Sequence, residues 1–314
     1  MFAAGYDIST NPDPWRFQLH PEIWLLMVAL IAGYVYAIRV IGPKVVPTGK
    51  VVTRRQVATF SFMITLMWLS TDWPIHDIAE EYLYSVHMVQ HMSLTMFIPP
   101  LALLSTPEWL FRLIIGDGRA LRIVRRACKP VVAGVVYNAG VIVSHIPGVV
   151  NVSASNSPVH YLVHVLLMTT AFMMWSPIVS PAREWRMSDG GKMLYLFSMS
   201  FVPTIPAGWL TFAESPVYKH YDTPVRVWGV NVMSDQQAAG AIMKLGGSVF
   251  MWAVIVFIFS KRFMRGFYGE QSYDRAVDSA GSGATGTEET LTFDQVEEAF
   301  RRTKPAPENP QTPA

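Results

Sequence analysis

The sequence predicts an all-α integral membrane protein, a bundle of seven transmembrane helices with its N-terminus outside the cell and its C-terminus in the cytoplasm. Hydrophobic residues make up 51% of the chain and charged residues only 15%. The apolar residues gather in long runs, and about 20 apolar residues are enough for one helix to cross a ~30 Å hydrocarbon layer. Lys and Arg gather in alternate connections between these runs, which is the pattern that orients membrane helices.

Taken in order along the chain, the apolar runs give seven predicted spans: 22–41, 56–71, 83–104, 130–146, 159–180, 193–212 and 238–260. The segment before the first run lacks the basic, apolar and small-residue regions of a cleaved signal peptide, so we expect that span to be retained. The predicted organisation is an outer N-terminal segment (1–21), a membrane domain (22–265) and a cytoplasmic tail (266–314).

The tail changes to Gly, Ser, Thr, Glu and Pro, a composition that predicts mostly disordered chain. One stretch differs, because Phe293, Val296 and Phe300 share one stripe of a helix. We therefore expect a short amphipathic helix near 292–302.

Positive charge sets the predicted orientation of the spans. The connections assigned to the cytoplasm contain Lys44, Lys50, Arg54, Arg55, Arg112, Arg119, Arg122, Arg125, Arg126, Lys129, Arg183, Arg186, Lys192, Lys261, Arg262 and Arg265. The opposite connections hold only Arg16, Lys219 and Arg226. Short loops rich in Lys and Arg stay in the cytoplasm, and with this topology all eight histidines fall on the outer side.

Two histidine pairs open the third and fifth predicted spans, His87 with His91 and His160 with His164. Residues four apart share one face of a helix, so each pair can present two imidazoles to one metal ion. The fourth span ends at His145, which reaches the same depth from the other direction. Ionisable groups inside a span are costly and usually functional, so we predict a metal or haem site from these five imidazoles.

Methionines extend the candidate site. Met88 and Met92, followed by Met96, form a stripe next to the histidines of the third span. Imidazole together with thioether favours Cu(I) among biological metal ions, although methionine is also common in ordinary apolar helices. The single cysteine, Cys128, lies in a cytoplasmic connection, so a disulfide or a Cys-x-x-Cys metal motif is excluded.

The start of the last span carries the polar residues Asp235 and Gln236 at the depth of the imidazoles. Asp235 is predicted to orient a ligating imidazole through its second nitrogen or, as the alternative, to cap its own helix. Lys244, two turns deeper, has three open roles: it can extend to the interface, pair with Asp235, or take part in chemistry.

Several function classes have no support in the sequence. It contains no P-loop, dinucleotide-binding fingerprint or Gly-x-Ser-x-Gly motif. The basic loops are explained by topology and by contact with anionic membrane lipid. We therefore expect no nucleic-acid partner.

Three motifs together resemble the multi-spanning CtaG-type assembly factors of bacterial caa3-type cytochrome c oxidase. They are the block from His87 to Met92 with Pro99-Pro100-Leu101 downstream, the pair His160 and His164, and the run from Asp235 to Gly240. The likeness covers roughly residues 15–265. Lys244 departs from it, because an apolar or aromatic residue is expected there, and the tail lies outside it.

The resemblance implies an assembly factor rather than an enzyme, a multi-pass protein of the bacterial plasma membrane that delivers copper to the oxidase at its subunit I. It implies His87, His91, His160 and His164 as copper ligands, with His145 and Asp235 in support. Further partners would be other assembly factors or an extracytoplasmic copper carrier.

Three alternatives remain open from the sequence. The histidine pairs can ligate haem b axially, which a Soret band would reveal. The chain can also be a metal-free assembly scaffold, which metal analysis would separate from a copper protein. A retinal protein with a Schiff base on Lys244 is disfavoured, because the third span offers no acidic counter-ion.

Overall fold

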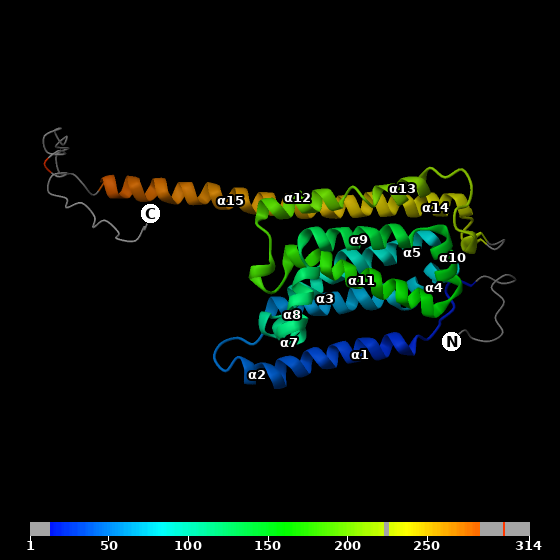
Figure 1. Ribbon diagram of the computed structural model, residues 1–314, viewed down its shortest axis with the longest axis horizontal. Coiled ribbons are helices and arrows are strands. Elements are labelled where there is room, and N and C mark those ends of the chain that lie inside the picture. The colour runs from blue at the N-terminus through cyan, green and yellow to red at the C-terminus, as the bar shows by residue number, and fades with distance from the viewer. Residues whose placement is uncertain (1–12, 223–225, 283–297, 299–314) are drawn as a thin grey trace, which may run out of the picture. The chain divides into compact units, whose positions relative to one another are not determined.

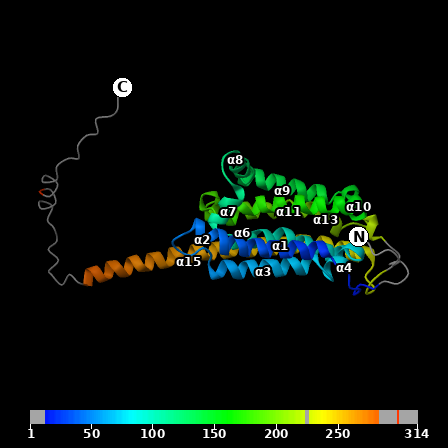
Figure 2. The same cartoon turned by 90° about the horizontal axis from the view of Figure 1, so that it is seen from below.

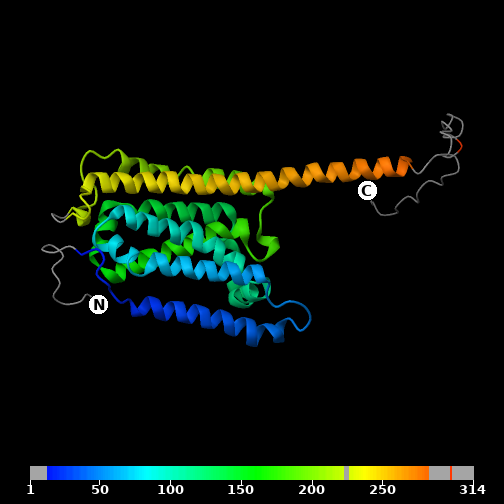
Figure 3. The same cartoon turned by 180° about the vertical axis from the view of Figure 1, so that it is seen from behind.

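The computed structural model describes residues 13–222, 226–282 and Glu298, with the backbone alone for 268–282. Packing divides the chain into two units, Met1–Ser260 and Lys261–Ala314. Within the described ranges every regular element is a helix, which confirms the predicted all-α class. In the first unit the long helices run side by side, with α4 and α10 at one end and α2, α7 and α8 at the other (Figures 1, 2 and 3).

Five described helical segments are long and apolar enough to cross a membrane: Pro21–Val45, Tyr84–Ser105, Ser157–Val179, Asp189–Thr211 and Val232–Arg265. Gly118–Ala127 and Pro130–Ser144 form a sixth candidate if the pair, bent by 69°, is counted as one span. The protein is therefore a membrane protein with five or six candidate spans in its described part, where the sequence predicts seven. The predicted span 56–71 falls on α3 (Arg54–Thr71), which lies outside this set.

The N-terminal part of the bundle consists of the first span and two helices that follow it. Its elements are α1 (Pro21–Tyr36), a π-turn η1 (Ala37–Ile41), α2 (Gly42–Val45), α3 and α4 (Ile75–Glu81). A reciprocal capping box between Thr53 and Gln56 starts α3. The start of α1 is tied to α4, because His20 Nε2 lies 2.8 Å from Asp77 Oδ1. This carboxylate raises the pKa of His20 above its ordinary value, against the opposing effect of burial.

Two spans contain a π-turn in their middle. The third predicted span consists of α5 (Tyr84–Met92), the π-turn η2 (Ser93–Phe97) and α6 (Ile98–Ser105). The last span consists of α14 (Val232–Ala241), the π-turn η5 (Ile242–Gly246) and α15 (Gly247–Ser282). Such turns inside α-helices are frequent at functional sites, and here η5 packs against α5.

The remaining helices complete the bundle. They are α7 (Glu108–Ile115), α8 (Gly118–Ala127), α9 (Pro130–Ser144), α10 (Pro147–Ser155), α11 (Ser157–Val179), α12 (Asp189–Met199) and α13 (Thr204–Thr211), with 3₁₀ turns at Arg183–Trp185 and Lys219–Tyr221. Helix α11 begins where the sequence predicts, with Pro158 in its first turn. The side chain of Asn156 caps it by accepting a hydrogen bond from Val159 N.

The largest core cluster lies between α5, α9, α11 and the last span, around the fully buried residues Met88, Tyr137 and Trp175. Helix α11 packs on α9 and α6, and α14 packs on both α13 and α5. Trp175 Nε1 donates to the carbonyl of Thr95, inside the η2 turn, at 3.1 Å. These contacts bring the first turns of α5 and α11 to the end of the bundle where α4 and α10 lie.

The candidate last span ends at Arg265, where the predicted membrane domain ends, but its helix continues further. The expected membrane domain ends at 265, yet α15 continues as regular helix to Ser282 and so occupies the first part of the predicted disordered tail. The predicted amphipathic helix near 292–302 lies outside the described residues, apart from Glu298.

Helices α13 and α14 lie close together at Gly240, and substitution of this residue tests their packing. A Cβ added there would lie 2.5 Å from Thr211 Oγ1 and 2.7 Å from Ala207 O. We expect Gly240→Ala to force the helices apart and to destabilise the protein by about 1–3 kcal/mol, seen as a lower Tm in detergent. In the matched control Gly208→Ala, also on α13, the added Cβ meets nothing within 4 Å. Equal Tm values for the two variants would contradict this account.

Candidate metal centre

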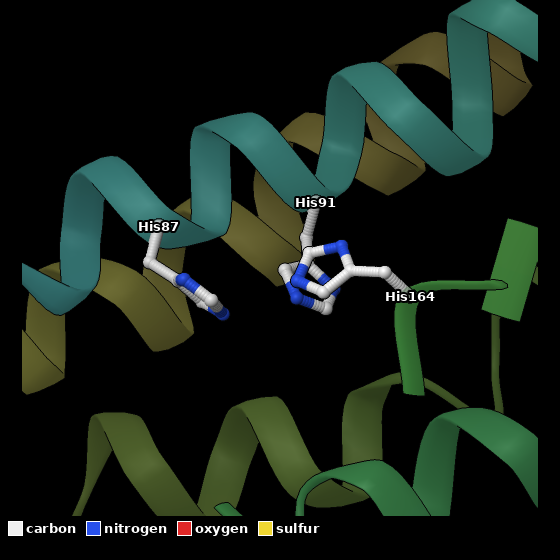
Figure 4. A group of neighbouring side chains, drawn as sticks. All are labelled: His87, His91 and His164. Carbon is white, nitrogen blue, oxygen red and sulfur yellow. The ribbon is translucent and has the colours of Figure 1, made fainter. Parts of the chain in front are cut away.

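Three imidazoles from two helices converge at the end of the bundle near α4. His87 and His91 come from α5 and His164 from α11, and their side chains point toward one another (Figure 4). One nitrogen from each lies within 4.8 Å of the others. The ring centroids are 4.5 Å apart for His87 and His91, 4.6 Å for His91 and His164, and 5.8 Å for His87 and His164. This spacing suits one ion held by several imidazoles.

The other two predicted imidazoles join the same cluster. The His160 ring lies 4.3 Å from that of His164 and 5.9 Å from that of His87. The His145 ring lies 6.5 Å from that of His91. All five histidines line one cavity of about 380 Å³, together with Tyr84 and Tyr221. The predicted convergence of five imidazoles from three helices is therefore present.

Glu80, on α4, is the acidic member of this cluster. Its Oε1 lies 3.1 Å from His87 Nδ1 and 3.3 Å from His160 Nε2. A carboxylate can only accept here, so His87 donates from Nδ1 and keeps the lone pair of Nε2 for a ligand, as in many carboxylate–histidine–metal sites. Burial opposes the charge, but the imidazoles of His87, His160 and His76 outweigh it and hold the pKa of Glu80 well below its usual range. The site therefore contains a fixed negative charge.

Glu80 also belongs to a second set of possible ligands. Ligand atoms of Glu80, His160 and His164 lie within 4.8 Å of one another. The two sets share His164. An ion can therefore pass between two neighbouring positions while one imidazole stays bound.

One nitrogen of the histidine that both sets share has no hydrogen-bond partner within the described part of the chain. His164 Nε2 is buried and has no hydrogen-bond partner among the described residues. A buried polar atom left unpaired costs about 1–3 kcal/mol, and most such atoms in proteins are satisfied. A metal ion at this nitrogen would remove the cost.

Glu80 is a residue of this cluster that is absent from the residues predicted for the site. Glu80 precedes His87 by seven residues, but the chain leaves helical geometry at Tyr82 and Leu83. That break folds α4 onto α5. A carboxylate on the short helix just before a histidine pair is the signal that would have suggested it.

Asp235 has a different role from the predicted one. It is 1% exposed, and its two oxygens accept hydrogen bonds from Tyr84 N at 2.8 Å and Ser85 N at 3.0 Å. It therefore acts on the site through the start of α5, and not through the second nitrogen of an imidazole, where Glu80 stands instead. A carboxylate at a helix N-terminus is favourable for both its charge and its hydrogen bonds. The cap of α14 itself is Asn231, which accepts from Ser234 N.

Gln236 likewise supports the site from a distance. Its Oε1 accepts from Val217 N at 2.9 Å and from Tyr218 N at 3.2 Å, and its Nε2 donates to Tyr218 O at 3.1 Å. The Tyr218 hydroxyl in turn donates to the carbonyl of His145 at 3.0 Å. Gln236 thereby fixes the loop that holds His145 in place.

The predicted methionine ligands lie beside the histidine group. Met88 and Met92 line an adjoining cavity of about 540 Å³, which shares His91 and His145 with the histidine cavity. Lys244 lines the same cavity, and its Nζ donates to Thr204 Oγ1. Of the three roles open for Lys244, pairing with Asp235 is not observed.

Comparison with known proteins gave one match. A family model described as cytochrome c oxidase caa3 assembly factor (Caa3_CtaG) matches residues 32–265, a range that contains Glu80, all five clustered histidines and Asp235. The comparisons with curated proteins and with solved structures gave no match.

Removal of the Asp235 carboxylate tests its role at the start of α5. Asp235→Ala removes the acceptor and leaves the amides of Tyr84 and Ser85 unpaired. Each hydrogen bond to a charged group contributes about 1.5–3 kcal/mol, so we expect the start of α5 to open more readily. Hydrogen–deuterium exchange of the peptide that spans these amides should become faster. Asp222→Ala is the control at the same end of the bundle, since that side chain is 53% exposed. Unchanged exchange in Asp235→Ala would rule out the capping role.

Proposed function

Because the chain belongs to the cytochrome c oxidase caa3 assembly factor family, we propose that it binds copper through its clustered histidines and delivers the ion to the oxidase. The family indicates an assembly factor that associates with cytochrome c oxidase, and not an enzyme. One observation carries the copper proposal: ligand nitrogens of His87, His91 and His164 lie within 4.8 Å of one another, and His164 Nε2 is buried without a hydrogen-bond partner among the described residues.

The donor set suits copper as Cu(I). Imidazole nitrogens bind copper strongly, and the thioethers of Met88 and Met92 in the adjoining cavity are soft ligands that favour Cu(I) over harder ions. The Glu80 carboxylate offsets the charge of a monovalent ion in a site that is otherwise neutral when its imidazoles are unprotonated. His160 and His145 complete the set as alternative ligands around the same cavity.

The site is proposed to face the outer side of the bacterial plasma membrane. The histidine cluster lies at the α4 and α10 end of the bundle, while α2, α7 and α8, with Lys44 and several arginines, lie at the opposite end (Figure 1). Basic connections stay in the cytoplasm, which supports an N-terminus outside and a C-terminus inside. This topology requires seven crossings, with α3 and α9 counted among them.

Delivery is proposed as a series of ligand exchanges. Copper from an extracytoplasmic carrier would enter at Glu80, His160 and His164 and move to His87 and His91 while His164 stays bound. An imidazole of the oxidase, in subunit I, would then displace these ligands one at a time. Each exchange forms one copper–ligand bond as another breaks, and the ion remains Cu(I) throughout.

Removal of two ligands tests the site directly. After anaerobic loading with Cu(I) and removal of unbound metal, the detergent-purified wild type should retain copper, measured by mass spectrometry. His87→Ala/His91→Ala should retain clearly less, because only His164 of the three-nitrogen set remains and Glu80, His160 and His164 supply only the proposed entry position. In cells the same variant should be inserted normally but fail to support oxidase activity, with partial rescue by excess copper.

The control for this experiment is His220→Gln, which changes a histidine at the same end of the bundle but outside both ligand sets. It should retain copper as the wild type does. Copper retained by the double variant at the wild-type level, or normal oxidase activity in its cells, would contradict the proposal. An absorption spectrum of the purified protein tests the haem alternative, because bound haem gives a Soret band.

Loss of the negative charge of Glu80 should weaken the binding of Cu(I) without removing a contact between helices. In Glu80→Gln the amide keeps the size of the side chain but no longer supplies the negative charge that faces His87 and His160. Loss of such an orienting partner typically costs 10–100-fold in metal affinity, and we expect about this decrease in a Cu(I) competition titration. Glu81→Gln, the neighbouring residue that accepts from Gln18 instead, is the matched control.

A further inference from the structure

We propose that the cavity next to the histidine cluster is a second Cu(I) site, built from methionine thioethers and filled from the histidines. This inference rests on the proposed function, since it takes copper to be the ion that the histidines bind. The cavity encloses about 540 Å³ and is lined by six methionines: Met88, Met92, Met96, Met199, Met243 and Met251.

The concentration of methionine at this cavity is the first argument. Six of its 17 lining residues are methionine, whereas the whole chain has 17 methionines in 314 residues. They come from α5, η2, α12, η5 and α15, so the stripe on one helix meets methionines from two other parts of the bundle. Methionine also fills gaps in ordinary cores, but several thioethers around one cavity can serve as a ligand set for a soft ion.

The thioethers lie inside the protein and not at its surface. Met88, Met96 and Met251 are 2%, 4% and 1% exposed. Asn138 Nδ2 lies 3.2 Å from Met199 Sδ, which fixes that sulfur, while Asn138 Oδ1 is buried without a hydrogen-bond partner among the described residues. Thioether sulfur is only a weak hydrogen-bond acceptor, so water gains little from this cavity and a soft cation gains more.

Two histidines connect the cavities. His91 and His145 line both the histidine cavity and the methionine cavity. His145 Nδ1 lies 2.7 Å from the carbonyl of Val141. A carbonyl only accepts, so the proton is on Nδ1 and the lone pair is on Nε2. His145 can therefore hold the ion while nitrogen ligands on one side are replaced by sulfur on the other, and the ion stays Cu(I).

Charge makes the two sites unequal. The histidine cavity has the Glu80 carboxylate beside it, whereas the methionine cavity is lined by Lys244, whose amine is held by Thr204. Like charges repel most strongly where the dielectric constant is low. Copper should therefore fill the histidines first and the methionines second, and the methionine site should release its ion more readily.

X-ray absorption at the copper edge tests this order. Cu(I) is added anaerobically to the detergent-purified full-length chain in two successive equivalents. The first should show nitrogen and oxygen scatterers, and the second should add sulfur. In Met96→Leu/Met243→Leu/Met251→Leu three of the six thioethers are removed, so the sulfur contribution should decrease. The first equivalent should still bind, because Leu and Met have similar volumes.

The matched control replaces three methionines of a different core cluster, Met27→Leu/Met63→Leu/Met67→Leu, and should keep the sulfur signal.

Lys244→Gln provides a second measurement that needs no change of ligand. Without the positive charge, the second equivalent should bind more tightly.

The outcomes separate this inference from the proposed function. Nitrogen ligation alone at both equivalents, or a sulfur contribution that is undiminished in the cavity variant, overturns the methionine site and leaves the histidine site standing. Sulfur ligation without nitrogen supports the methionine site and overturns the histidine site. A wild type that binds no copper overturns both.

Discussion

Burial of charged and polar groups inside an apolar bundle is the constraint on which the rest of this structure depends. Asp235 and Gln236 are buried and Glu80 is partly buried, so each gains from a partner within the protein. Glu80 is paired with imidazoles of α5 and α11, Asp235 with backbone amides of α5, and Gln236 with the loop before α14. Each partner lies on a different element from the group that it satisfies. The same interactions therefore also hold in place the helices that present the histidines.

The histidine arrangement could be predicted from the sequence because it follows from helical periodicity. His87 and His91, like His160 and His164, are four residues apart, and antiparallel neighbours bring His145 to the same depth. Contacts that cross between elements leave no such pattern. The break at Tyr82 brings Glu80 to the site, and Asp235 accepts a hydrogen bond from an amide 150 residues away. Both contacts depend on backbone positions and not on residue types.

The same distinction applies to the fold. Long apolar runs identified most of the bundle, since hydropathy alone decides whether a helix can lie in lipid. The two predicted spans that lie outside the five candidates, on α3 and α9, are those where that signal is diluted. Helix α3 opens with Arg54, Arg55 and Gln56, and α8 and α9 meet at a bend of 69°. The convergence of methionines from several helices was also invisible, because only the stripe on α5 and η2 is regular in sequence.

The π-turn at Ser93–Phe97 has a consequence for how this span changes over evolution. An α-helix turns by about 100° per residue, so the one residue that a π-turn adds shifts the angular phase of everything after it. Deletion of a single residue there would keep the length and hydropathy of the span. It would nevertheless rotate Pro99 and Pro100 relative to His87, and with them the surface that packs on α3 and α11. Within this span, the number of residues and not their hydropathy keeps the face that carries the histidines aligned with the face that packs on other helices.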